Sequence, residues 1–116
     1  MTPDDLRELC LGLAGAVEER PFGPQTSVFK VGGKIFVLSP LDAEGPLQLS
    51  LKIDPPLGED LRASYECVRP GYHLNKKHWV TIEVGGDVPD ELIEGLVEDS
   101  YDLVKPRPRR GRTAPA

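Results

Sequence analysis

The residues best suited to chemistry lie together between positions 69 and 79. This segment contains both histidines of the chain, its single tryptophan and two adjacent lysines. Their side chains offer hydrogen-bond donors suited to an anion, which indicates an anion or nucleic-acid contact. A second interpretation is open, in which the aromatic residues pack in the core, Asn75 occupies a left-handed turn position and the lysines only face water. The candidate binding residues here are Arg69, Tyr72, His73, Asn75, Lys76, Lys77, His78 and Trp79.

This segment does not complete a catalytic or metal site. His73 and His78 are five residues apart, so a metal would need a carboxylate from elsewhere in the chain. Spacing pairs no serine or cysteine nucleophile with either histidine, and no glycine-rich phosphate loop is present. Cys10 and Cys67 each lie in an apolar pattern, which indicates buried thiols. The sequence therefore predicts a protein that is not an enzyme and needs no cofactor or resident metal.

The charge is divided between two regions of opposite sign. Residues 1–104 carry 9 basic and 19 acidic side chains, whereas residues 105–116 carry five basic side chains and no acid. The second region is rich in proline and arginine and cannot bury enough apolar area to fold, so we expect a domain over 1–104 and a disordered tail. The tail is either an arm that contacts phosphates or a solubilising segment without a partner. Its arginines are Arg107, Arg109, Arg110 and Arg112.

Four acids also recur at helical spacing near the end of the domain: Asp90, Glu94, Glu98 and Asp102. Like charges four residues apart repel each other on a helix, so this stripe is expected to face water. Such a ridge could gather cations, although a solvated face is the more common outcome.

The elements that must position these residues follow from the apolar periodicity. Helices are predicted over residues 3–14, 55–66 and 89–104, and strands over 27–31, 34–38, 47–53, 68–73 and 78–84, with a loop over 15–25. Gly32 and Gly33 predict a tight hairpin turn, and residues 74–77 join a second hairpin. The order αβββαββα predicts an α+β sandwich: a five-stranded antiparallel sheet with helices covering one face and the other face partly exposed.

Length and composition limit the classes of protein to which this sequence can belong. A chain of 116 residues with 39% hydrophobic and 28% charged residues is one ordinary globular domain. No apolar run approaches the ~18 residues of a membrane helix, and the first residues lack the features of a signal peptide. We expect a cytoplasmic protein that does not contact membranes.

Several segments together resemble the MmcQ/YjbR family. They are residues 22–23, 29–36, the run Pro70-Gly71-Tyr72-His73-Leu74-Asn75-Lys76-Lys77-His78-Trp79, and Ser100-Tyr101-Asp102-Leu103-Val104. The resemblance covers residues 3–104 and leaves out the tail. Leu74 stands where family members often have methionine, and Val80 stands where asparagine is common. These two departures leave the basic and aromatic residues of the central run unchanged.

This resemblance implies a small bacterial α+β domain, similar in outline to frataxin-like and secretion-chaperone-like sandwiches. Family members are commonly described as predicted DNA-binding proteins with a double-wing motif. On this chain the wings would be the hairpins around Gly32-Gly33 and around Asn75-Lys76-Lys77. Phosphates would then face Lys30, Lys34, Arg69, Lys76 and Lys77.

Three functional hypotheses remain open. The first is non-catalytic DNA binding through the basic hairpins, helped by the tail. The second is a cleft for a small anionic ligand or a partner protein, lined by Tyr72, His73, Asn75, His78 and Trp79. The third is metal handling on the acidic helix. The net charge of residues 1–104 opposes the first unless the acids cluster away from the hairpins.

Overall fold

The computed structural model describes residues 1–41, 45–71 and 74–106. It is an α+β structure with three helices and one antiparallel sheet of six strands. The elements are α1 (Pro3–Leu11), β1 (Val17–Glu19), β2 (Thr26–Val31), β3 (Lys34–Pro40), β4 (Gln48–Lys52), α2 (Pro55–Ser64), β5 (Val68–Pro70), β6 (Trp79–Glu83) and α3 (Asp90–Val104).

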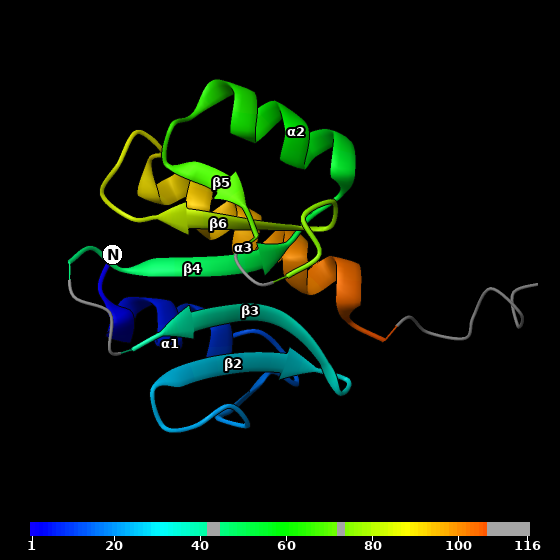
Figure 1. Cartoon of the computed structure of the whole chain (residues 1–116). Helices are drawn as coiled ribbons and strands as arrows, with labels where there is room; N and C mark the ends of the chain where they lie inside the picture. The colour runs from blue at the N-terminus through cyan, green and yellow to red at the C-terminus, as the bar shows by residue number, and fades with distance from the viewer. Residues whose placement is uncertain (42–44, 72–73, 107–116) are drawn as a thin grey trace, which may run out of the picture.

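The strands lie in the order β1-β2-β3-β4-β6-β5, and α2 is inserted between β4 and β5 in the chain (Figure 1). Helices α1 and α3 lie behind the sheet in Figure 1, whereas α2 lies beside the edge strand β5. The face turned away from α1 and α3 carries no helix among the described residues (Figure 1). This open face is the partly exposed surface that the sequence predicts.

The prediction of five strands is wrong by one strand, because the expected loop over 15–25 contains β1. The three residues of β1 pair with β2, with Glu18 opposite Phe29. The Glu18 carboxylate accepts hydrogen bonds from Ser27 at 2.5 Å and from Arg7 at 2.7 Å, which fixes the strand to β2 and α1. The hydrogen bond from Ser27 is the largest of the effects that lower the pKa of Glu18. The element order is therefore αββββαββα.

Two predicted elements are also shorter than expected. Helix α1 begins with a capping box between Thr2 and Asp5 but ends at Leu11, followed by the cap residue Gly12. The described part of the predicted strand 68–73 is a strand only over Val68–Pro70. Proline has no amide proton to continue a ladder, so a strand readily ends there.

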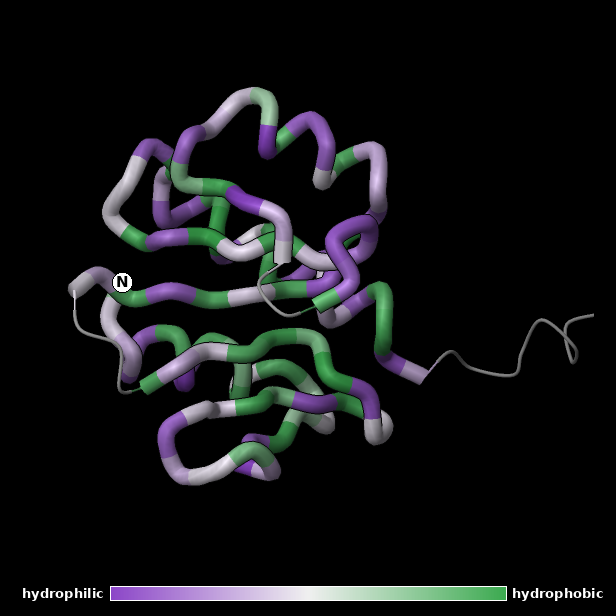
Figure 2. Tube along the Cα trace, viewed as in Figure 1, coloured by the Kyte–Doolittle hydropathy of each residue, from purple (hydrophilic) through white to green (hydrophobic). Residues whose placement is uncertain are grey.

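The core lies between the sheet and the helices α1 and α3. Phe36, Leu49 and Ile82 from the sheet are fully buried, and Ile93 and Val97 of α3 pack into the same cluster. In Figure 2 the hydrophobic colouring follows the strands, β3 in particular, whereas α2 is largely hydrophilic. Among the described residues, no helix is long and apolar enough to cross a membrane.

A buried serine joins α3 to the middle of the sheet. Ser100 Oγ donates a hydrogen bond to the Phe36 carbonyl at 2.7 Å and accepts one from the Lys52 amide at 3.0 Å. Strands β3 and β4 pair only at Val37 with Leu51 and at Leu38 with Ser50. The Ser100 hydroxyl therefore satisfies backbone groups on both strands where their own ladder stops.

A carboxylate at the far end of β6 fixes the start of β5 and gives a pH-dependent contribution to stability. Asp87 accepts hydrogen bonds from the Glu66 amide at 2.8 Å and the Cys67 amide at 3.0 Å. The Cys67 thiol and these amides hold the pKa of Asp87 at about 2, below its ordinary 3.8. The folded protein therefore binds this proton less readily than the unfolded chain.

We expect this stabilisation to be complete above about pH 4 and to disappear as the pH falls towards about 2. Asp87→Asn should lower the thermal unfolding midpoint at pH 7 and weaken its dependence on pH between those values. Thermal melts of both proteins across the acid range test this. An equal loss of thermal stability with falling pH in the two proteins would contradict the assignment of this pH dependence to Asp87.

Candidate nucleic-acid interface

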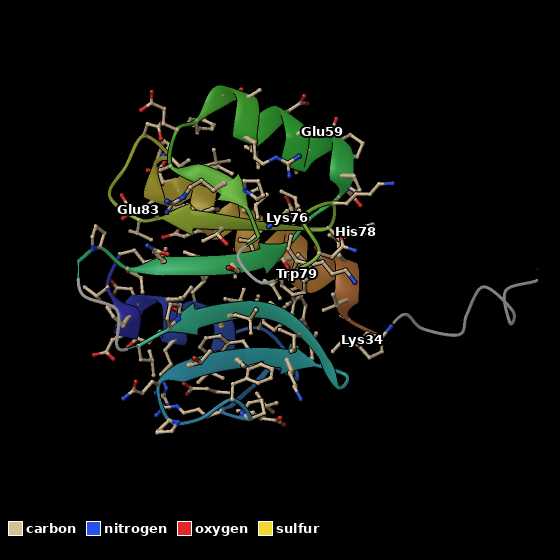
Figure 3. All side chains as sticks on the ribbon, in the orientation of Figure 1. Lys34, Glu59, Lys76, His78, Trp79 and Glu83 are labelled. Carbon is tan, nitrogen blue, oxygen red and sulfur yellow. The ribbon has the colours of Figure 1, made fainter. Side chains whose placement is uncertain are left out.

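All six lysines of the chain lie at one end of the sheet, which we call the basic end. Strands β2 and β4 finish there and β3 and β6 begin there, because Val31 pairs with Lys34 and Lys52 pairs with Trp79. The same end receives the last turn of α3, since Pro106 packs against Gly32. Figure 3 labels Lys34, Lys76, His78 and Trp79 around this end. The lysines are Lys30, Lys34, Lys52, Lys76, Lys77 and Lys105.

The first predicted wing is a tight hairpin, as expected. Gly32 and Gly33 have φ values of +59° and +80°, which other residues rarely adopt. Lys34 follows the turn and is exposed. Lys30, on the neighbouring strand, is half-buried and pairs with Glu19 of β1 at 2.9 Å, so part of its charge is already neutralised.

The second predicted wing is the connection between β5 and β6, and its described residues contact α2 and β6. Its chain reverses at Asn75, whose side chain accepts a hydrogen bond from the Lys77 amide at 2.9 Å. The His78 amide also bonds the Asn75 carbonyl at 3.2 Å. Arg62 of α2 donates to the Lys76 carbonyl at 3.0 Å, which ties the loop to the helix. These backbone contacts leave the side chains of Lys76, Lys77 and His78 exposed.

Gly71 lets this loop approach the first residue of β6. Its amide donates to the Trp79 carbonyl at 3.0 Å, and a Cβ at this position would lie 2.7 Å from the Trp79 Cβ. A side chain at position 71 would therefore push the loop away from Trp79. The glycine in the motif is explained by this close contact.

The structure divides the predicted site residues into groups. Lys34, Lys76, Lys77 and His78 are exposed at the basic end and make no ion pair with another described residue. Arg69 lies along β5 with its guanidinium 3.9 Å from Glu83, away from the basic end. Tyr72, His73 and the tail arginines Arg107, Arg109, Arg110 and Arg112 lie outside the described residues.

Lys52 and Lys105 belong to the basic end but were not predicted as site residues. Lys52 is half-buried and, with Asp54, Asp99 and others, lines a recess of about 270 Å³. Lys105 pairs with Asp102 at 3.0 Å. Both lysines follow the last residues of predicted elements, so the sequence could have placed them at this end. The nearby acids weaken the attraction of both lysines for an anion.

The open face of the sheet has a cavity of about 550 Å³ beside the basic end. Its floor includes the hydroxyls of Ser50 and Thr81, which lie 2.8 Å apart. Trp79 is the one residue of the predicted ligand cleft that lines it; the other described members, Asn75 and His78, do not. The lining residues are Phe22, Thr26, Ile35, Leu38, Pro40, Gln48, Ser50, Leu74, Trp79 and Thr81.

The acidic stripe on α3 faces water, as expected. All four of its acids are exposed, and Asp90 accepts a hydrogen bond from the Met1 amine at 2.9 Å. Within the described part of the chain, no three His, Cys, Asp or Glu side chains are arranged to hold a metal ion. The two cysteines are free and buried, and burial raises the pKa of Cys10 to about 12.

An open antiparallel sheet with two helices behind it and a lysine-rich end defines a small α+β domain. The YjbR family model matches residues 11–103, and the chain belongs to this family. It is 43% identical over 84 residues to the uncharacterized protein YbdF of Escherichia coli O157:H7, covering 72% of this chain and 68% of that one. It is 36% identical over 101 residues to the uncharacterized protein YjbR of Escherichia coli K12, covering 87% and 85%.

A solved structure is similar over nearly the whole chain. The crystal structure of Deinococcus radiodurans protein DR2400, with a DUF419 domain, is 44% identical with a TM-score of 0.86. The match covers 97% of this chain and 86% of that one. These comparisons confirm the family that the sequence motifs indicate.

Proposed function

We propose that this protein is a non-catalytic nucleic-acid-binding protein that holds phosphates at its basic end. One observation carries the proposal: Lys34, Lys76 and Lys77 reach the same end of the sheet from two separate connections, all exposed and without an ion pair to another described residue. Phosphate contacts supply most of the affinity of proteins that bind nucleic acid without reading sequence.

The excess of acid over residues 1–104 is compatible with this role because one group of acids lies at the opposite end, whereas Asp54, Asp99 and Asp102 lie beside Lys52 and Lys105. Helix α3 begins at that opposite end at Asp90 and runs towards the basic end (Figure 1). Asp5, Glu8, Asp90 and Glu94 line one recess around Met1. A duplex or single strand at the basic end would therefore lie far from this acidic region, which limits repulsion at physiological ionic strength.

The tail extends the proposed interface. It leaves the domain beside Lys34, because Pro106 contacts Gly32 in the turn before that lysine. We assign Arg107, Arg109, Arg110 and Arg112 to a phosphate-binding arm, with residues 1–104 as the domain that anchors it. A cytoplasmic location, where bacterial nucleic acid is accessible, belongs to the same proposal.

Fluorescence anisotropy of a labelled oligonucleotide tests this function. The full chain is compared with a variant in which the four tail arginines are glutamine, over a series of salt concentrations. We expect both proteins to bind and both affinities to fall steeply with salt, with a smaller slope for the tail variant. Loss of all binding in the tail variant would contradict a binding site on the domain.

The cavity on the open face supports a second candidate function, in which a small ligand or an apolar segment of a partner protein binds beside Trp79. A volume of about 550 Å³ lies in the range of small-molecule sites. This function predicts saturable binding with little dependence on salt, in contrast to phosphate binding.

A further inference from the structure

We infer that the cavity on the open face receives an unpaired base of single-stranded DNA whose phosphates are held at the basic end. This inference rests on the proposed function and makes it more specific, because it names the form of nucleic acid that is bound. It depends on the position of the cavity, on its chemistry and on the charge around it.

The cavity and the free lysines come from the same short segments. Ile35 lines the cavity directly after Lys34, and Leu74 and Trp79 line it on either side of Lys76 and Lys77. Lys34 precedes Ile35 at the start of β3, and the side chains of neighbouring strand residues point to opposite faces, so Lys34 marks the end of the sheet and does not form the cavity wall. A phosphate at the lysines and a base in the cavity are therefore compatible with one continuous chain of nucleotides.

The chemistry of the cavity suits a nucleobase. Apolar side chains form most of its wall, and the Trp79 indole supplies an aromatic surface on which a base can stack. The Gln48 side chain makes no hydrogen bond to another described residue and can pair with the edge of a base. The hydroxyls of Ser50 and Thr81, which bond each other, add a polar patch at the floor.

Charge complementarity selects this occupant over a purely apolar one. Lys34, Lys76 and Lys77 make no ion pair with another described residue and lie one or two positions in the sequence from residues that line the cavity, and the chain continues from the same end into four arginines. A polyanion with a flat aromatic group in each unit satisfies both features. The bases of a duplex are stacked and paired, so their faces are not available to Trp79, and we expect single strands to bind more tightly than duplexes.

Trp79 provides a direct test because it is the only tryptophan of the chain. Titration of the full chain with a short thymidine oligonucleotide should give a saturable loss of tryptophan fluorescence, at the same concentrations that saturate anisotropy. Trp79→Ala should weaken single-strand binding about 5- to 150-fold, as expected for the loss of one stacked base. Trp79→Phe keeps an aromatic ring and should recover most of the affinity.

A second variant tests the cavity without changing position 79, where a substitution could also disturb folding. Phe22 is 68% exposed at the cavity, so Phe22→Ala should leave folding intact and still weaken single-strand binding severalfold. Leu57→Ala is the matched control, since Leu57 is also exposed but lies on α2 outside the cavity. This control should bind like the unaltered chain.

The outcomes separate this inference from the proposed function. Salt-dependent binding without a change in tryptophan fluorescence, and with unaltered affinity in Trp79→Ala and Phe22→Ala, would overturn the base-binding cavity and leave phosphate binding intact. Equal affinity for duplex and single strand would overturn it as well. Absence of any oligonucleotide binding would overturn both.

Discussion

Replacing Lys34, Lys76 and Lys77 by alanine together should weaken nucleic-acid binding by about tenfold or more at low salt. Each lysine that neutralises a phosphate releases condensed counterions, which contributes about 0.9 to the slope of log affinity against log salt for a duplex. The triple variant should therefore lose about 2.7 from that slope if all three contact phosphates. Anisotropy over a salt series measures both quantities.

A matched control uses lysines of the same end that already have partners. Lys30 pairs with Glu19 and Lys105 pairs with Asp102, so the double alanine variant removes two positive charges without removing two free phosphate ligands. We expect it to change affinity and slope much less than the triple variant. An equal effect per charge would mean that net charge alone governs binding and that the three exposed lysines form no site.

The second large effect concerns stability and is expected for Ser100→Ala. This change removes the hydroxyl that bonds the Phe36 carbonyl and the Lys52 amide, and the side chain of Ser100 is fully buried. A buried polar group left without a partner costs about 1–3 kcal/mol. We therefore expect the free energy of unfolding to fall by about 2 kcal/mol or more, because two such groups lose the same partner.

Urea denaturation of the purified protein measures this loss, with Ser64→Ala as the control. Ser64 is exposed in the last turn of α2, and its replacement should change stability by less than about 0.5 kcal/mol. A similarly small change in Ser100→Ala would show that β3 and β4 do not depend on the serine bridge.

The sequence predicts those elements that have a strong local signal. The alternation around Leu49 and Leu51 predicts β4, and the paired glycines predict the β2–β3 turn with positive φ at both positions. Strand β1 is not predicted because it has three residues and no apolar alternation of its own. It is held by Glu18, whose partners Arg7 and Ser27 are known only once α1 and β2 are placed.

The candidate site is also predicted only where its residues have a local sequence signal. The residue types identify Lys34, Lys76 and Lys77, and exposed connections leave those side chains accessible. Ion pairing of Lys30 and Arg69 depends on which residues lie on the neighbouring strands, which the sequence alone does not specify. The cavity on the open face combines side chains from five separate segments and has no local sequence signal.

The structure also divides the family motifs by role. Tyr101 packs edge-on against Phe36 with ring centroids 5.6 Å apart, and its hydroxyl donates to the Ala14 carbonyl. With Ser100 these residues hold α3 against the sheet, so their segments are explained by folding. The described part of the segment from Gly71 to Trp79 differs, because its backbone contacts are structural whereas the side chains of Lys76, Lys77 and His78 are exposed.

The most direct test of phosphate binding at the basic end is an NMR titration of the isotope-labelled full chain with an oligonucleotide. We predict that the largest changes in amide shifts fall on residues 32–35 and 74–79, with further changes in the tail. They should decrease together as salt is added, because counterion release drives the contact. Changes confined to the tail, or centred on α1 and α2, would contradict an interface at the basic end.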